Sequence, residues 1–432
     1  MSVRRRRHAR WSRVTAAALA LAGALAVAPP AGAAASAASA ASVARPETGP
    51  VAAVTERLAD RARTARATSA TEPRVQVTRT SGDWAFGTAV LATEPGSAPL
   101  PQGWLFLAER EDGRWTAALE GERAFAALAR RAPLVEGREQ ALLAAQDGSR
   151  SEARRPEAHG AADRRGTYAA GGDFRTGMAL PTTAGRATYM TSGPHGWSGA
   201  AAPWSSLDFA GGDEAVRAAR QGTAYTMCRG WIRVVHDRGY ATDYYHLWNH
   251  IDADGAAVNT GTYLGDTGTD VTCGGSATGR HVHFALRQNG DYVGVAGHAL
   301  GRWVFFNGGG AYQGHALLGS RQVGPGGALH HHGALGFTQG VIDTFGGTHL
   351  NKRTGPGTGH GLAGTVADGA TVDIACSADG TSHTGRYGTT SLWNRLSDGT
   401  WVSDAFLWTG VSGPVNGWCQ AARPDGLPGA GA

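Results

Sequence analysis

The sequence predicts a mainly β protein, and three observations support this fold class. From about residue 171 onward, short runs rich in apolar and β-branched residues recur, such as TAYTM at 223–227, WIRVV at 231–235 and HVHFAL at 281–286. Gly and Asn/Asp turns separate these runs, as is typical of antiparallel strands. Helical periodicity is rare in this part of the chain, apart from the brief segment DEAVRAAR at 213–220. We therefore expect antiparallel β-sheets after residue 171 and a small α+β region before it.

The first 36 residues have the composition of a secretory signal peptide. An Arg-rich start precedes an apolar run from Val14 to Ala28, and an Ala-x-Ala-like end follows near residues 31–37. The apolar run is short for a membrane span. We expect a secreted protein with no stable membrane insertion after signal removal. An uncleaved anchor is the alternative, and the sequence leaves a twin-arginine export route open.

Residues 37–165 are interpreted as a pro-region with a small α+β fold. Alternation in WLFLAER at 104–110 predicts a strand, and ERAFAALARR at 122–131 predicts an amphipathic helix. A polar, Arg-rich segment follows at 151–166, and exposed polar linkers are where proteolysis concentrates. The mature chain is therefore expected to begin between about residues 155 and 175.

The charge distribution supports the same division. Residues 1–165 hold 24 Arg and 17 acidic residues, a balance of +7, whereas residues 166–432 hold 16 Lys plus Arg and 18 acidic residues, a balance of −2. The overall charge of +5 thus describes the part expected to be removed. The basic segments lack the interleaved aromatic residues that stack on bases. We therefore expect no nucleic-acid partner.

Four cysteines indicate disulfides, because an even number in a secreted chain favours pairing. Three pairings are possible, and the simplest joins Cys228 to Cys273 and Cys376 to Cys419, each within one β region. A loop of more than forty residues would gain about 4 kcal/mol from such closure. Metal binding by cysteines is the alternative, and the absence of any CxxC pair disfavours it.

A set of histidines and one aspartate lies within four short motifs. The motifs are GPHGWSG, SSLDFAGGD, YYHLW and TGRHVHFAL, and they contain His195, Asp208, His246, His281 and His283. In a strand, residues i and i+2 project from the same face, so the two histidines of HVH would share one side. Neutral imidazoles and a carboxylate are ligands that zinc prefers, and a catalytic zinc site keeps one position open for water.

These motifs resemble those of the lysostaphin-type zinc endopeptidases, most closely the β-lytic and staphylolytic branch. The resemblance covers roughly residues 170–315, and we place a zinc peptidase domain at 166–318. It implies that His195, Asp208 and His283 bind Zn²⁺ and that His246 and His281 are catalytic. The helical HExxH signature of other zinc peptidases is absent from the sequence. Tyr312 is a further candidate for an oxyanion donor, although an ordinary buried tyrosine is the alternative.

The remaining histidines are expected to have no catalytic role. His236 and His250 are interpreted as structural or surface residues. The cluster from His330 to His332 lies next to or within the Gly-rich segment 319–335, which we predict to be a flexible, solvated linker.

The last segment, residues 336–432, is predicted to form a second small β domain. It resembles a bacterial SH3-like barrel in the turn NKRTGPGT, the segment GTVADGATVDI and the hairpin WNRLSDGTWVSD. Such domains commonly bind cell-wall peptides, so the resemblance implies a wall-binding role. A β barrel without a ligand is the alternative.

The resemblance implies a secreted, monomeric, zinc-dependent endopeptidase, extracellular or associated with the cell wall. Its expected partners are peptides of bacterial peptidoglycan, cut in cross-bridges or stem peptides, with Gly-containing bonds favoured. One alternative is a peptidase that acts on Gly-rich proteins. Another is a non-catalytic wall-binding or regulatory protein on a peptidase fold, although such a protein would be expected to lose some of the five motif residues.

Overall fold

The computed structural model describes residues 49–64, 71–149 and 173–419. The predicted signal peptide and the expected start of the mature chain near 155–172 lie outside these residues. Within them the chain is mainly β, with three α-helices near its N-terminal end, so the predicted fold class is confirmed. No helix in the described ranges has the length and apolar character that a membrane span requires.

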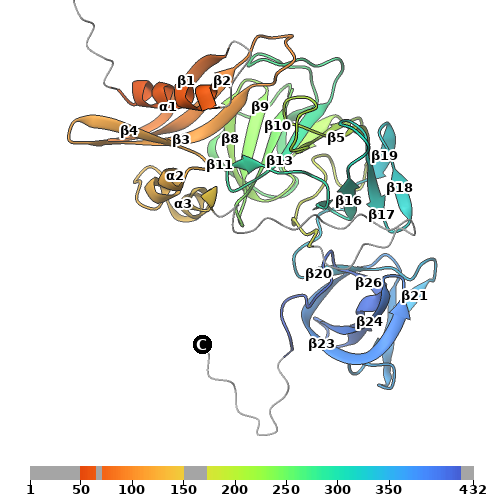
Figure 1. Ribbon diagram of the computed structural model, residues 1–432. Helices are drawn as coiled ribbons and strands as arrows, with labels where there is room; N and C mark the ends of the chain where they lie inside the picture. The colour runs from red at the N-terminus through yellow and green to blue at the C-terminus, as the bar shows by residue number, and fades with distance from the viewer. Residues whose placement is uncertain (1–48, 65–70, 150–172, 420–432) are drawn as a thin grey trace, which may run out of the picture. The chain divides into compact units, whose positions relative to one another are not determined.

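The N-terminal unit combines one antiparallel sheet with three helices (Figure 1). Its elements are α1 (Pro50–Thr64), β1 (Glu72–Ser81), β2 (Trp84–Ala92), β3 (Gln102–Glu111), β4 (Arg114–Leu119), α2 (Arg123–Ala129) and α3 (Gly137–Ala144). The β3–β4 turn is made by Asp112 and Gly113, both with positive φ, as a tight hairpin requires. Helix α1 places Val54 and Leu58 against Phe106 in one apolar cluster. The α+β character expected for this region is thus present, including the predicted helix at α2.

A nine-stranded antiparallel sheet forms the centre of the next part of the chain. Its strands are β5 (Ala187–His195), β6 (Ser206–Ala210), β8 (Gly222–Cys228), β9 (Trp231–Val235), β10 (Tyr240–Tyr245), β11 (Asp254–Val258), β13 (Val282–Gln288), β14 (Asp291–Tyr292) and β19 (Gly327–His330). They are ordered β11-β8-β9-β10-β13-β6-β5-β19, with β14 paired to β13.

The two faces of this sheet belong to different hydrophobic clusters. One face places Ile232, Phe284 and Leu286 in the main core of the domain. The other face carries Trp231 and Tyr245, which join a cluster that includes apolar residues of β3 and α3 in the N-terminal unit. Alternation along each strand produces this separation. The N-terminal unit therefore packs on one face of the sheet.

Two smaller sheets complete this domain. One pairs β7 (Ala215–Arg217) with β12 (Tyr263–Asp266), and the other is formed by β15 (Ala299–Leu300), β16 (Trp303–Phe306), β17 (His315–Leu318) and β18 (Arg321–Val323). The helical pattern noted at 213–220 is wrong, because β7 buries Val216 and pairs with β12.

The prediction of a flexible linker at 319–335 is also wrong. This segment contains β18 and β19, and β19 pairs with β5 in the main sheet. Leu329 is fully buried, and His331 is 3% exposed instead of solvated. The apolar residues between the glycines anchor the segment, while Gly319 and Gly326 provide turns with positive φ.

The C-terminal domain is a seven-stranded antiparallel sheet. It contains β20 (Gln339–Ile342), β21 (His349–Arg353), β22 (Leu362–Ala367), β23 (Thr371–Gly385), β24 (Gly388–Leu396), β25 (Trp401–Ser403), the short 3-10 helix η1 (Asp404–Phe406) and β26 (Leu407–Trp408). Its core includes Ile342, Ile374 and Val402. A second cluster joins Trp408 to Phe174, so this domain packs against the preceding one.

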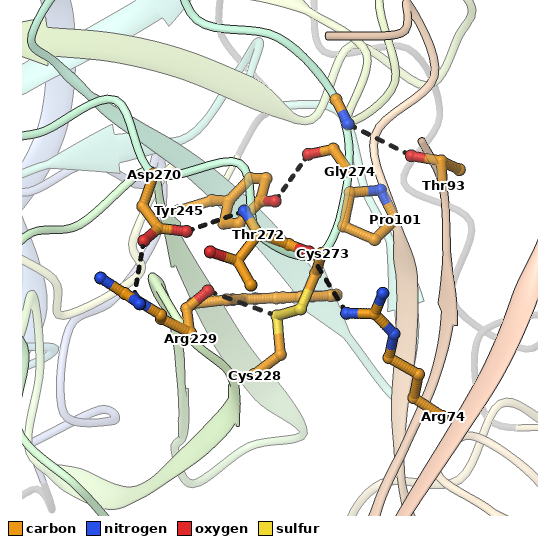
Figure 2. The surroundings of a disulfide bond; sticks show 12 residues. Arg74, Thr93, Pro101, Cys228, Arg229, Tyr245, Asp270, Thr272, Cys273 and Gly274 are labelled. Carbon is orange, nitrogen blue, oxygen red and sulfur yellow. Dashed lines mark hydrogen bonds and ion pairs between the residues drawn. A yellow bond between two sulfur atoms is a disulfide. The ribbon is translucent and has the colours of Figure 1, made fainter. Parts of the chain in front are cut away.

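Both predicted disulfides are present, Cys228–Cys273 and Cys376–Cys419. The first ties the end of β8 to the loop at 270–275. Figure 2 shows that Arg74 and Thr93 of the N-terminal unit lie beside this disulfide. Each bond lies within one domain, which is the pairing that the sequence favoured.

Candidate metal centre

Three neighbouring strands bring the predicted metal ligands together. His283 of β13 is directly opposite Asp208 of β6 in the antiparallel register. His195 ends β5, the neighbour of β6 on its other side. All three side chains are buried, and they form the one group of at least three metal-donor residues found among the described residues.

The three donor atoms are spaced as zinc ligands would be. His283 Nδ1 lies 2.9 Å from Asp208 Oδ1 and 3.2 Å from His195 Nε2. His195 Nε2 lies 3.5 Å from Asp208 Oδ1. Ligand atoms of a tetrahedral zinc with bonds of about 2.0–2.1 Å are separated by about 3.3 Å. The two imidazoles and the carboxylate therefore fit a zinc ion in donor type and in spacing.

Hydrogen bonds around the ligands fix the orientation of their rings. His195 holds its Nδ1 2.8 Å from the carbonyl of Gly193, which leaves Nε2 for a metal. His283 turns Nδ1 toward the other ligands, and its buried Nε2 has no hydrogen-bond partner in the described part of the chain. Leaving a buried polar atom unpaired costs about 1–3 kcal/mol, a cost that metal binding by the same ring can offset.

The electrostatics of Asp208 and His283 suit metal binding, whereas His195 must lose its proton to bind a metal. Burial alone would raise the pKa of Asp208, but hydrogen bonds from His195 and His283 hold it well below its usual range. Burial opposes protonation of His195, and the Asp208 carboxylate outweighs it, so that pKa is raised. Burial lowers the pKa of His283. Asp208 is therefore ionised and His283 neutral, the forms in which both bind metals.

His246 and His281 lie beside these ligands. Their ring centroids are 4.8 Å apart, and His281 Nε2 is 3.8 Å from Asp208 Oδ1. His246 Nδ1 is 2.9 Å from the Asp270 carbonyl and His281 Nδ1 is 2.8 Å from the Gly279 carbonyl. Both rings thus keep Nε2 free of these backbone contacts. The structure brings all five predicted residues to one place.

His246 has the properties of a proton acceptor. It follows β10 with a φ of 71°, an uncommon conformation for a residue with a side chain. Burial, followed by the neighbouring His283 and His281, lowers its pKa to about 3. The ring is therefore neutral near neutral pH and can accept a proton.

Tyr312 is close to the site and is not an ordinary buried tyrosine. Its ring stacks on His195 with centroids 4.4 Å apart, and 45% of the residue is exposed. Its backbone N–H donates to the carbonyl of Pro194, and its carbonyl accepts from Gly193 N–H, so it is fixed beside the His195 strand.

His236, His250 and His331 make their hydrogen bonds outside the group of five site residues. His236 is fully buried and bonds the Gln221 carbonyl and the Thr242 hydroxyl, as expected for a structural residue. His250 Nδ1 contacts the carbonyl of Ile251. His331, predicted to be solvated, bonds the Leu180 carbonyl through Nε2.

A loop of the N-terminal unit is attached on two sides of the metal centre. On one side, Trp197 Nε1 donates to the Pro101 carbonyl, and its ring centroid is 5.0 Å from that of His283. On the other side, Thr93 N–H donates to the carbonyl of Cys273, and Gly96 N–H donates to that of Gly275. The Thr93 hydroxyl oxygen also accepts from Gly275 N–H (Figure 2). Residues 93–101 therefore connect both sides of the site.

Sequence reasoning missed a buried ion network on the same face of the sheet. Arg233 forms ion pairs with Asp243 of β10 and with Glu120 of the N-terminal unit, and all three side chains are fully buried. Asp243 also accepts hydrogen bonds from Trp231 and Tyr292. Arg233 and Asp243 each lie inside a strand otherwise rich in apolar and aromatic residues. Charged residues at such positions were the sequence signal that could have indicated a buried ion pair.

Comparison with known proteins identifies the domain that carries the site. Residues 202–295 match the model described as Peptidase family M23, a range that includes four of the five site residues. The chain is 34% identical over 135 residues to Protease LasA of Pseudomonas aeruginosa, covering 29% of this chain and 32% of LasA. It is 33% identical over 111 residues to Beta-lytic metalloendopeptidase of Lysobacter enzymogenes, covering 23% and 61%. The matched region thus spans about a third of the length of LasA.

Two further similarities concern an uncharacterized protein and a solved structure. The chain is 37% identical over 95 residues to Uncharacterized protein YraI of Bacillus subtilis, covering 20% of this chain and 80% of YraI, so over that stretch it belongs to the same family as YraI. The solved structure is titled as the M23 metalloprotease pseudoalterin from the deep sea. It is 31% identical, with 35% of this chain and 97% of that chain covered and a TM-score of 0.34.

Proposed function

We infer that this protein is a secreted zinc endopeptidase that hydrolyses peptides of bacterial peptidoglycan. The premise is the match of residues 202–295 to Peptidase family M23 and the similarity to LasA. The observation that carries this proposal is the buried triangle of His195, Asp208 and His283, with two further imidazoles beside it. The two disulfides support an oxidising, extracellular location. Gly-containing bonds in cross-bridges or stem peptides are the proposed substrate.

The proposed mechanism divides the five residues into two groups. His195, Asp208 and His283 would hold zinc, which supplies a Lewis acid and lowers the pKa of a bound water toward about 7. His246, which lies beside the ligands with a neutral ring, is the proposed acceptor of the proton from the attacking water. His281, whose Nε2 lies on the same side, donates a hydrogen bond or a proton to the oxyanion or the leaving amine. The Tyr312 hydroxyl, beside His195, is a second candidate donor to the oxyanion.

We also propose that the protein is made as a zymogen and that residues 37–165 form its pro-region. The contacts of residues 93–101 with Trp197 and with the loop at 273–275 support this proposal, because they attach the N-terminal unit to segments that adjoin the site residues. Proteolysis between about residues 155 and 175, mostly outside the described residues, would then open the site. N-terminal sequencing of the secreted form tests it, and an active form that begins near residue 38 would contradict it.

The substrate is tested by digestion of purified peptidoglycans that differ in their cross-bridges, followed by mass analysis of the fragments. We expect new termini at Gly-containing bonds, and cleavage slowed by about 10²–10⁴-fold in a His281→Ala control. Cleavage of elastin-like proteins without cleavage of any peptidoglycan would favour the broader Gly-rich peptidase. Zinc binding without any hydrolysis would favour a non-catalytic wall-binding protein.

The C-terminal domain is proposed to be an SH3-like unit that binds cell walls. Its described surface carries three large exposed hydrophobic residues, Phe345, Leu362 and Trp418, and these are the residues that we propose to contact the wall. Deleting the C-terminal domain would expose Phe174, which packs with Trp408 of that domain. Substitution of surface residues is therefore the cleaner test. In a His281→Ala background, replacing the three residues with Ser should reduce sedimentation with purified walls. Unchanged sedimentation would show that these residues are not the anchor.

A further inference from the structure

A pocket separate from the metal centre lies between the β17–β18 turn and the C-terminal domain. Its volume is about 440 Å³. Gly319 and Arg321 line it from one domain, and Asp343, Phe345, Arg386 and Trp408 line it from the other. None of these residues belongs to the motifs that predicted the peptidase site.

Arg386 is the unusual group in this pocket. Only 6% of its side chain is exposed. Its Nη2 is buried and has no hydrogen-bond partner in the part of the chain that the structure describes. Its Nε lies 3.5 Å from Asp343 Oδ2, which is too long for a strong hydrogen bond. A buried guanidinium nitrogen without an acceptor is costly unless a ligand supplies one.

The nearby carboxylates are already engaged. Asp343 Oδ2 accepts a 2.7 Å hydrogen bond from the Tyr387 hydroxyl, and Oδ1 accepts the Phe345 N–H at 3.0 Å. Asp368 Oδ1 accepts both the N–H and the hydroxyl of Thr344. Asp343 faces Arg386 through the 3.5 Å contact with Nε alone, and Asp368 is held by Thr344.

The charges around the pocket favour a singly charged anion. Arg302, Arg321 and Arg386 line it together with Asp343 and Asp368, an excess of one positive charge. Arg302 is engaged by the Gly369 carbonyl and the Thr371 hydroxyl. Nη2 of Arg386 remains without an acceptor, and the excess of one positive charge matches a carboxylate, whereas a phosphate dianion would also face the two acidic residues.

The space in front of Arg386 depends on a glycine. A Cβ atom added to Gly319 would lie 3.2 Å from Asp343 Oδ2 and 3.8 Å from Arg386 Nη2. The missing side chain thus leaves space beside the buried guanidinium. Phe345, 69% exposed, has its ring 4.8 Å from the guanidinium and forms an aromatic wall for a small residue.

We propose that this pocket binds the free C-terminal carboxylate of a short peptide with small side chains, with Arg386 as the group that accepts it. The carboxylate forms hydrogen bonds with Nη2, and the last residues of the peptide pack against Phe345 and Trp408. This proposal rests on the proposed function, because hydrolysis of each peptide bond produces one new C-terminal carboxylate. The pocket would then retain the enzyme on material that has already been cut.

The test is calorimetric. The full chain is first treated with a chelator to remove the metal, and peptides are then titrated into it while the heat of binding is measured. Removing the metal prevents a carboxylate from binding at the His195 site, so the result is independent of hydrolysis. We expect N-acetyl-triglycine to bind and its C-terminal amide to bind at least tenfold more weakly. Arg386→Met should lose at least tenfold in affinity, and Arg386→Lys should lose less. Arg395→Met, which removes an exposed charge from the same domain, should bind normally.

A second pair of variants tests the pocket without changing its charge. Gly319→Ala fills the space beside Arg386, whereas Gly326→Ala also has a positive φ but meets no atom within 4 Å. We expect only Gly319→Ala to weaken binding, and this pair decides the matter if Arg386→Met does not fold. Equal binding of acid and amide, no effect of Arg386→Met or Gly319→Ala, or tighter binding of inorganic phosphate than of the peptide would each overturn the proposal.

Discussion

The two faces of the nine-stranded sheet are built from the same strands but have different compositions. The core face presents Ile232, Phe284 and Leu286 to other apolar residues. The opposite face carries the buried charges of Arg233 and Asp243, and His283 lies at its end. A face that only had to fold would need no charges, because buried ion pairs contribute little to stability compared with apolar packing. Under the proposed processing, the second face has two states: the N-terminal unit covers it before cleavage, and it is exposed after that unit is removed.

The cover on this face comes from the N-terminal unit. Arg233 has one carboxylate partner in its own sheet, Asp243, and one in the cover, Glu120. If the cover leaves, Arg233 keeps Asp243 and gains water. Ile232, Phe284 and Leu286 on the core face have no such alternative partner. They would be left in solvent if the residues packed against them were removed. This comparison predicts which substitutions should depend on the presence of the N-terminal unit.

The largest expected effect is at the metal end of the covered face. Asp208→Ala removes the one anionic ligand, so we expect loss of zinc and loss of hydrolysis to below detection. Metal analysis and a peptidoglycan assay measure the two losses. Asp252→Ala, which removes an exposed carboxylate, is the matched control and should keep both. Full activity in a metal-free preparation would contradict the site.

Substitution of the catalytic candidates should have a smaller effect. His246→Ala and His281→Ala should keep zinc, because neither is in the donor triangle, and their rates should fall by about 10²–10⁴-fold. Zinc content and turnover are measured on the same samples, with His250→Ala as the control. Loss of zinc as complete as in His283→Ala would show that the assignment of roles is wrong.

Core-face and covered-face substitutions should respond differently to processing. Phe284→Ala should cost about 3–5 kcal/mol of unfolding free energy with or without residues 49–149, because its cluster lies within the domain. Met227→Ala on the covered face should cost about 2–5 kcal/mol in the intact chain and clearly less in the processed chain. Urea denaturation of both forms measures this. The same cost in both forms for Met227→Ala would remove the distinction between the faces.

The smallest effect is expected at the ion network. Glu120→Gln weakens one partner of Arg233 and should cost about 1–3 kcal/mol in the intact chain. The same substitution should promote release of the N-terminal unit after cleavage, which gel filtration of the cleaved protein can measure. Glu136→Gln, an exposed residue of the same unit, is the control. A release rate that does not change would show that this network does not hold the cover.

Local patterns predicted the site residues, and distant contacts limited the rest. The alternation in HVHFAL and the motif around Asp208 identified residues that the strand register then brought together. The cover was not predictable, because it depends on contacts such as that between Glu120 and Arg233, 113 positions apart. The Gly-rich segment 319–335 was misinterpreted as flexible because composition does not reveal that Leu329 finds a buried place beside β5.

The disulfide Cys228–Cys273 has a consequence for how the protein responds to its surroundings. In the intact chain, the loop at 273–275 is held twice, covalently through Cys273 and by hydrogen bonds to Thr93 and Gly96. After loss of the N-terminal unit, the covalent link to β8 remains and the hydrogen bonds do not. Reductants should therefore inactivate the processed enzyme while leaving the folded precursor less affected. Under the proposed processing, sensitivity to thiols would mark maturation and would confine the active form to oxidising surroundings.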